Sequence, residues 1–157
     1  MSSPLERGWG EVKIKTMKKL ILIIAVSFLV TATFAQSEKF ITSMKSNIAA
    51  IDSSFKNPKN LLELANKFER IAVAEKNQWL AWYYAALCQV NYTYREQDKS
   101  KIDPIADKAT ELINKADALN PNNSEISCIK SMIATAHMMV NPMQRFQEYG
   151  SEAASYL

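Results

Sequence analysis

Apolar residues recur along most of this chain at spacings of three and four, which is the period of helices with one buried face. The pattern is first clear at Phe40, Met44, Ile48 and Ile51, and it predicts a helix over about residues 37–53. Little of the sequence alternates in the way that a half-buried strand requires. An all-α fold is therefore expected.

Pairs of a polar residue and proline separate the helical patterns. Asn57-Pro58 predicts the start of a second helix that ends near Glu75, with asparagine as the cap and proline in the first turn. Asp103-Pro104 repeats this signal and predicts the start of a fourth helix. Between them, the third helix is the most apolar part of the domain.

The remaining boundaries follow from the same reasoning. The expected helices after the second span about residues 78–96, 103–119 and 124–139, with a short one from Ser151. Residues 97–102 form a charged loop. The stretch from Met143 to Tyr149 is open between a short helix and a loop. The domain is thus five to six helices, arranged as stacked antiparallel hairpins.

Residues 17–35 have the pattern of a cleavable secretory signal peptide. Two lysines precede an apolar run over residues 20–30, and a small-x-small motif ends at Ala35. The run is shorter than the roughly 20 residues that a helix needs to cross a membrane. Cleavage is expected between Ala35 and Gln36, with Ala32 as the alternative site. The protein is therefore expected to be periplasmic or secreted.

Removing the signal changes the picture of charge. Residues 1–16 are interpreted as a disordered upstream extension, with Met17 as the true start, so residues 36–157 form the mature domain. The whole chain carries a net charge of +3, but the mature part is neutral. Nucleic-acid binding usually needs clustered positive charge, so it is excluded. Membrane association is expected only through the export signal.

The residues that could carry chemistry are few. His137 is the only histidine, and it is interpreted as a surface residue. Cys88 and Cys128 fall on apolar helical positions and are expected to be free, with a disulfide between them as the alternative. Glycine is too rare for a phosphate-binding loop. Neither enzymatic activity nor a metal or other cofactor is expected.

An internal repeat relates the second, fourth and last helices at an offset of 45 residues. Leu64, Phe68 and Ile71 map onto Ala109, Ile113 and Ala116, and Ala109 and Leu112 map onto Ala154 and Leu157. Repeats of this kind stack helical hairpins, and about three are usually needed for stability. The chain holds two and a fraction, which suggests a domain truncated at its C-terminus.

The fourth helix carries a family resemblance. Ala109-x3-Ile113-x2-Ala116-x4-Pro121 resembles the second helix of a tetratricopeptide repeat and its terminal proline, which places Trp82 at the tryptophan position of the first helix. Ala85 and Gln89 depart from that pattern, and the period exceeds the usual ~34 residues. The resemblance implies a TPR-like α-solenoid whose first helices line a binding groove, at Tyr83, Leu87, Asn91, Glu125 and Cys128.

The aromatic residues of the third helix are the richest functional signal. Most fit a packed hairpin core, but Tyr84 and Tyr92 fall off the main apolar stripe and are candidates for ligand contacts. The predicted function is a non-enzymatic module that binds a protein or peptide in the cell envelope. The alternative is the N-terminal helical part of a longer exported enzyme or carbohydrate-uptake component. The sequence does not predict an oligomeric state.

Overall fold

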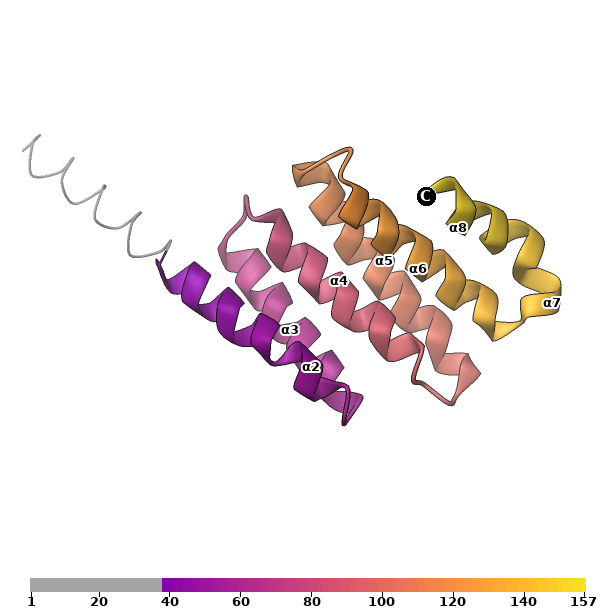
Figure 1. Ribbon diagram of the computed structural model, residues 1–157, viewed down its shortest axis with the longest axis horizontal. Coiled ribbons are helices and arrows are strands. Elements are labelled where there is room, and N and C mark those ends of the chain that lie inside the picture. Colours follow the sequence, from indigo (N-terminus) through magenta and orange to yellow (C-terminus); the bar gives the residue numbers. More distant parts are fainter. Residues whose placement is uncertain (1–37) are drawn as a thin grey trace, which may run out of the picture. The chain divides into compact units, whose positions relative to one another are not determined.

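A computed structural model describes residues 38–157, and their regular secondary structure is helical throughout (Figure 1). The expected all-α class is confirmed. The upstream extension, the signal peptide and its cleavage position at Ala35 and Gln36 lie outside the described residues. The chain divides into two units, Met1–Ile41 and Thr42–Leu157, and the second holds nearly all of the described helices. No helix within residues 38–157 has the length and apolar character to cross a membrane.

The first expected helix is interrupted near its end. A helix covers residues 38–49, and the short α2 (Ile51–Ser54) follows after a turn at Ala50. The hydroxyls of Ser53 and Ser54 donate to the carbonyl oxygen of Ala50 at 2.9 and 2.8 Å. Side-chain hydroxyls that bond to a nearby carbonyl compete with the helical ladder and bend it. The break therefore has a local cause.

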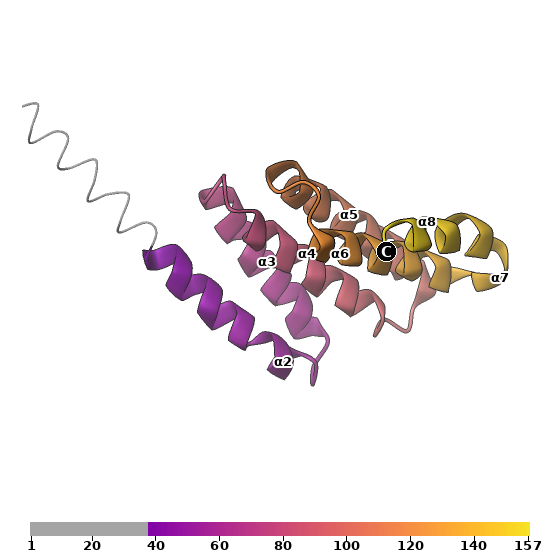
Figure 2. The same cartoon turned by 45° about the horizontal axis from the view of Figure 1, so that its top comes forward.

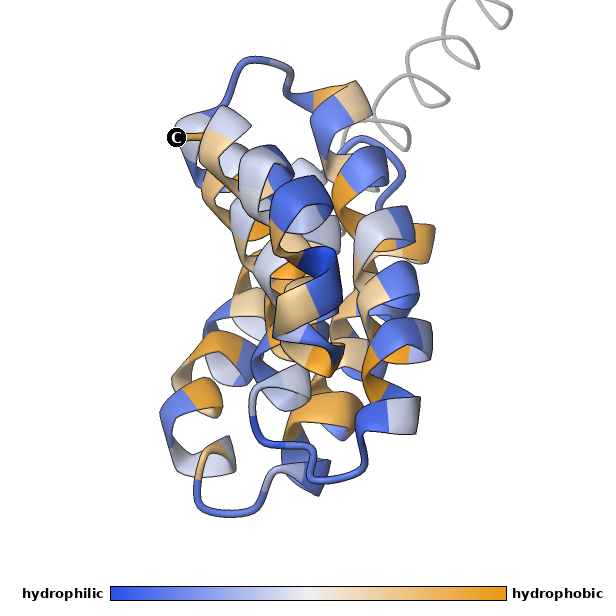
Figure 3. Cartoon of the chain, turned by 90° about the vertical axis from the view of Figure 1, so that its right-hand side faces the viewer, coloured by the Kyte–Doolittle hydropathy of each residue, from blue (hydrophilic) through white to orange (hydrophobic). Residues whose placement is uncertain are grey.

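Four longer helices form the body of the second unit. They are α3 (Lys59–Ala74), α4 (Trp79–Thr93), α5 (Ile102–Leu119) and α6 (Ser124–Val140). Each packs against the next in chain order, and α4 also contacts α6 (Figure 1). Hydrophilic residues prevail in the connecting loops and on the outward turns (Figure 3). The four helices begin and end within a few residues of their expected positions.

The core lies between α3, α4 and α5. On α3 the expected apolar stripe is buried, and Phe68 is the largest side chain that is fully enclosed. On α5 the buried residues follow helical spacing in the same way: Ile102, Ala106, Ala109, Leu112, Ile113 and Ala116. The small side chains of Ala81, Ala85 and Ala86 let α4 approach both neighbours closely. Burial on more than one side makes α4 the central helix.

The internal repeat has a structural counterpart in only two of its three copies. Leu64 and Phe68 on α3 are buried, as are their counterparts Ala109 and Ile113 on α5. In the third copy Ala154 is exposed and Leu157 is 88% exposed. The expectation that the last helix repeats the same buried face is wrong for this structure, because that helix is only five residues long and no described element covers these side chains.

The residues after α6, 142–157, are called the C-terminal segment. It consists of α7 (Pro142–Arg145), one turn of π-helix labelled η2 (Phe146–Gly150) and α8 (Ser151–Ser155). The open question about residues 143–149 is thus answered in favour of helix. Figures 1 and 2 both show α8 running back alongside α6, which it contacts. None of the residues of α7, η2 and α8 is buried.

Asp103 corrects the expected start of the fourth helix. α5 begins at Ile102, directly after the 3-10 turn Lys99–Lys101, and its N-cap residue makes no side-chain hydrogen bond. The Asp103 carboxylate instead accepts hydrogen bonds from Arg145 and pairs with His137. His137 is 9% exposed, so its interpretation as a surface residue is also wrong. Contacts between residues more than 30 positions apart override the local capping signal.

Candidate binding site

The face shared by α4 and α6 is the candidate site. Tyr83 of α4 lies close enough to Glu125 and Cys128 of α6 for their charges to affect its phenol. α4 and α6 are not consecutive, and they approach because each packs on α5 from the same side of the stack. The structure thus brings together three of the residues that the sequence predicted for a groove.

Aromatic side chains cover the N-terminal half of this face. Trp79 and Tyr83 meet edge to face with ring centroids 5.7 Å apart, and Tyr83 and Tyr84 do so at 5.2 Å. Tyr84 in turn stacks on the buried ring of Phe68 at 5.3 Å. Edge-to-face and offset-stacked rings are the favoured aromatic geometries. Trp79, Tyr83 and Tyr84, called the aromatic cluster, are therefore rigidly supported by the core while each stays partly exposed.

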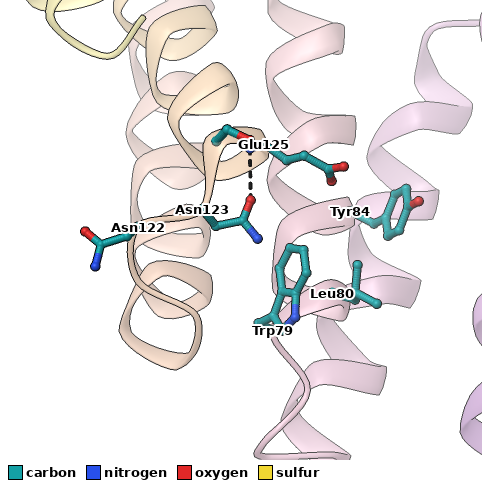
Figure 4. Close-up of a pocket in the computed structure, with 7 residues that line it drawn as sticks. Trp79, Leu80, Tyr84, Asn122, Asn123 and Glu125 are labelled. Atoms are coloured by element: carbon teal, nitrogen blue, oxygen red, sulfur yellow. Dashed lines mark hydrogen bonds between the residues drawn. The ribbon is translucent and has the colours of Figure 1, made fainter.

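A hollow of about 600 Å³ lies beside the aromatic cluster, between the N-terminal ends of α4 and α6. Its lining is Trp79, Leu80, Tyr84, Asn122, Asn123, Ser124 and Glu125. In Figure 4 the Glu125 carboxylate extends from α6 toward α4, whereas the Asn122 side chain points away from Trp79. The hollow therefore combines an aromatic wall with a polar rim.

The polar rim is shaped by the turn between α5 and α6. Asn122 has a φ of 60°, in the left-handed region that asparagine tolerates better than most residues. Asn123 then caps α6, because its side-chain oxygen accepts from the backbone nitrogens of Glu125 at 2.9 Å and Ile126 at 3.4 Å. These two asparagines fix where α6 starts and hence where Glu125 stands.

The surroundings of Tyr83 favour the protonated form of its phenol. Burial raises the pKa of Tyr83, and the negative charge of Glu125 raises it further. Tyr83 is thus a neutral hydrogen-bond donor or acceptor at physiological pH, as ordinary tyrosine is. Beside Tyr83, the carboxylate of Glu125 offers a hydrogen-bond acceptor, and Cys128 offers an exposed thiol.

Polar groups in the C-terminal half of the face are engaged in internal hydrogen bonds. Leu87 and Asn91 follow Tyr83 at four-residue spacing and are half-buried. The Asn91 amide donates to the carbonyl oxygen of Leu87 at 2.8 Å. Beyond them the Tyr94 hydroxyl donates to the carbonyl oxygen of Met132 at 2.6 Å, which ties α4 to α6. Free polar groups are therefore concentrated near the hollow.

The two tyrosines proposed as extra ligand contacts have different places. Tyr84 belongs to the aromatic cluster and lines the hollow. Tyr92 lies near the end of α4, where its hydroxyl donates to Glu96 at 2.7 Å, and it is absent from the described lining of the hollow. That hydrogen bond to Glu96 raises the pKa of Tyr92.

The two cysteines are free thiols in the structure, so the alternative of a disulfide is not formed. Cys88 is buried in α4, and burial raises its pKa to about 12, whereas Cys128 is exposed on α6. Cys88 is therefore a packing residue of the core, whereas Cys128 belongs to the candidate site. Among residues 38–157, no group of three or more His, Cys, Asp and Glu side chains is arranged to hold a metal ion.

Sequence reasoning missed the wall that the α5–α6 turn contributes. Asn122 and Asn123 were not considered for the site from the sequence, nor were Leu80 and Ser124. A turn of three asparagines around a proline directly before a candidate groove helix was the available signal. Nothing in the sequence showed that this turn faces the start of α4.

Over residues 38–157, fold and site together define an all-helical domain with an aromatic candidate face on non-consecutive helices. Comparison with known proteins adds one relationship. Among solved structures the chain is similar to the HusA haemophore from Porphyromonas gingivalis, with 35% sequence identity and a TM-score of 0.67. The match covers 74% of this chain and 56% of the haemophore, so the chain spans little more than half of that protein. No protein-family model matches the chain, and a search of curated proteins finds no match.

The likeness supports a helical-repeat type of fold, although it does not identify a tetratricopeptide family. The matched protein is itself a haemophore, which is a binding protein.

Proposed function

We propose that this chain is an exported, non-enzymatic binding protein that holds a flat, largely apolar ring of the haem type on the face shared by α4 and α6. The observation that carries the proposal is the coincidence of two features. The chain is 35% identical to a haemophore over most of its length, and its aromatic cluster borders a hollow of suitable size.

The aromatic part of the lining suits one face of such a ligand, whereas the rest of this open hollow is polar. Small-molecule sites commonly measure about 300–1,000 Å³ and combine aromatic walls with a few polar groups. Trp79 and Tyr84 provide ring surfaces for stacking, and Asn123 and Glu125 provide a polar edge. The cluster rests on Phe68, so little conformational freedom is lost when a ligand binds.

A peptide is the second candidate, and a different observation favours it. Tyr83, Leu87 and Asn91 continue the face along α4 for two turns beyond the hollow, opposite Cys128 on α6. An extended chain would use this length, whereas a compact ring would use the hollow alone. The TPR-like frame proposed from the sequence fits either ligand, because stacked hairpins often present such elongated surfaces.

Titration with haemin tests the proposal. Binding is followed by the visible absorbance of haemin and by quenching of tryptophan fluorescence. Replacing Trp79→Ala removes a wall of the hollow and is expected to weaken binding about tenfold, as loss of an aromatic stacking partner does. Tyr92→Ala is the matched control, because it removes another half-buried aromatic residue of α4 outside the described lining of the hollow.

The outcomes are distinct. Saturable haemin binding that W79A weakens and Y92A leaves unchanged supports the ring ligand. Haemin binding that neither substitution changes places the ligand elsewhere and rejects this site. If haemin does not bind and peptides protect Leu87 and Asn91 from hydrogen exchange, the second candidate replaces the first.

A further inference from the structure

The C-terminal segment is fastened to the rest of the domain in an unusual way. None of the residues in α7, η2 and α8 is buried, and Met143 and Phe146 are 95% and 68% exposed. A segment without buried apolar side chains gains little from the hydrophobic effect. Something else must hold it against α6.

A cluster of charged and aromatic groups provides that attachment. Arg145 of α7 donates to both oxygens of Asp103 on α5, at 2.7 and 2.9 Å, and also to the carbonyl oxygen of His137 at 3.0 Å. His137 Nδ1 lies 2.8 Å from the same Asp103 carboxylate. The ring of His137 stacks on Tyr149 of η2 at 5.1 Å. One arginine thus links α7 to both α5 and α6.

Further groups surround this cluster. Asp107 of α5 lies 3.6 Å from His137 Nε2, and the Arg145 guanidinium lies 5.8 Å from the centre of the Tyr149 ring. Two-pronged arginine–carboxylate pairs are among the stronger polar interactions because both the charge and the planar geometry match. The side chains of Asp103 and Arg145 are about two-thirds buried, so water weakens this pair less than a fully exposed one.

The C-terminal segment covers a continuous face of α6. Lys130, Ala134, His137 and Met138 recur on α6 at helical spacing. Lys130 lies 5.8 Å from the ring of Tyr156, and the sulfur of Met138 lies beside Gly150. Ala134, between them, is only 2% exposed. Displacing the segment would uncover this face while leaving the contacts among α3, α4 and α5 in place.

We propose that the C-terminal segment is a strap that opens from α6 as a unit, and that the Asp103–Arg145 pair is the latch that keeps it closed. Regions that open below the global unfolding free energy are those with few buried contacts and exposed hydrogen bonds. The segment has these properties, and the π-helical turn at its centre is a type of irregularity often found at functional positions.

Hydrogen exchange measured by mass spectrometry on the whole chain tests this latch. Arg145→Gln removes the charged fork and is expected to speed exchange in residues 142–157 about tenfold, while exchange in α3, α4 and α5 stays unchanged. Arg145→Lys keeps the charge without the two-pronged geometry, so an intermediate rate is expected. Lys108→Gln is the matched control, because it breaks another partly buried pair, Lys108–Glu69 at 2.8 Å between α5 and α3.

The latch is overturned if residues 142–157 of R145Q exchange at the wild-type rate. It is also overturned if K108Q speeds exchange in those residues as much as R145Q does, or if R145Q speeds exchange in α3, α4 and α5 as well. Added salt gives a readout that needs no variant. Screening should speed exchange in residues 142–157 of the wild-type chain relative to α5, by less than R145Q does because a partly buried pair is screened less than an exposed one. An unchanged ratio would contradict an ionic latch even if R145Q failed to fold.

Discussion

Two regions of this chain are held together by different forces. The stack of α3, α4 and α5 encloses large apolar side chains such as Phe68, Leu61 and Leu112. The C-terminal segment encloses none, and it relies on the cluster around Asp103 and Arg145. Both regions are helical, and both contact α6: the stack through α4 and α5, and the C-terminal segment directly. Regular secondary structure alone therefore does not indicate how strongly a region is fixed.

The difference matters for the candidate site. The aromatic cluster stands on the strongly packed side, where Tyr84 stacks on Phe68. A binding face needs such rigid support if its side chains are to meet a ligand without a large loss of freedom. The weakly fastened side, by contrast, has the properties of a moving part. The candidate site thus lies on the packed region, and the proposed strap is the charge-held one.

Replacing one phenylalanine in each region should give the largest difference in the free energy of unfolding. Phe68→Ala empties a fully enclosed position and is expected to lower the free energy of unfolding by about 3–5 kcal/mol. Phe146→Ala changes a side chain that is 68% exposed, and the expected change is within about 0.5 kcal/mol. Urea denaturation followed by circular dichroism measures both. Equal losses would show that the C-terminal segment contributes to the core.

The sequence was sufficient for the helices because their start and stop signals are local. Asn57-Pro58 stands directly before α3, but Pro58 and not Asn57 occupies the N-cap position, so that part of the prediction is wrong. Asn123 caps α6 with its side chain, as an asparagine in that position often does. α4 was placed correctly along the chain, but its buried residues were only partly predicted. Ala85 and Gln89, considered departures from the repeat pattern, are both buried. A helix that is apolar on most sides has no periodicity that shows which side meets which neighbour.

For the site, too, residues within a recognisable pattern could be predicted, and contacts between distant residues could not. Tyr83, Glu125 and Cys128 were grouped from the resemblance to a repeat family, and the structure brings them together. The pairing of Asp103 with His137 and Arg145 could not be predicted, because these residues are 34 and 42 positions apart and match no motif. Local rules then favoured a capping role for Asp103. Long-range polar contacts leave no regular trace in a single sequence.

A smaller contrast is expected from removing one hydroxyl in each region. Tyr94→Phe deletes the hydrogen bond to the Met132 carbonyl between α4 and α6, and it should cost about 1 kcal/mol. Burial raises the pKa of Tyr94 to about 12, which agrees with a protonated, donating phenol. Tyr156→Phe is the counterpart, because its hydroxyl contacts only exposed Glu152 at 3.3 Å. Thermal unfolding should separate the two, and a loss of similar size in Y156F would contradict the contrast.

Acid should weaken the C-terminal segment before it weakens the core, and this is the smallest of the three effects. The hydrogen bonds from Arg145, and to a lesser degree from His137, hold the pKa of Asp103 below its usual 3.8. A depressed pKa means that the carboxylate contributes its full stabilisation at pH values above the unfolded value, about 3.9, and loses it as the pH falls through the lower folded value. The segment should therefore stay closed at pH 5 and begin to open only as the pH falls below about 4.

Asp103→Asn separates this effect from general acid unfolding. The substitution removes the titrating group but keeps the side-chain shape, so hydrogen exchange in residues 142–157, after correction for the intrinsic pH dependence of exchange, should respond less to acid than in the wild-type chain. Arg145 and His137, which contact this position, and Asp107, which lies 3.6 Å from His137, all remain in the variant. Comparison of the two chains therefore isolates the Asp103 proton. If acid loosens the segment equally in both chains, a group other than Asp103 controls the attachment. The C-terminal segment would then not be held by the Asp103–Arg145 pair, and the contrast with the packed stack of α3, α4 and α5 would lose its basis.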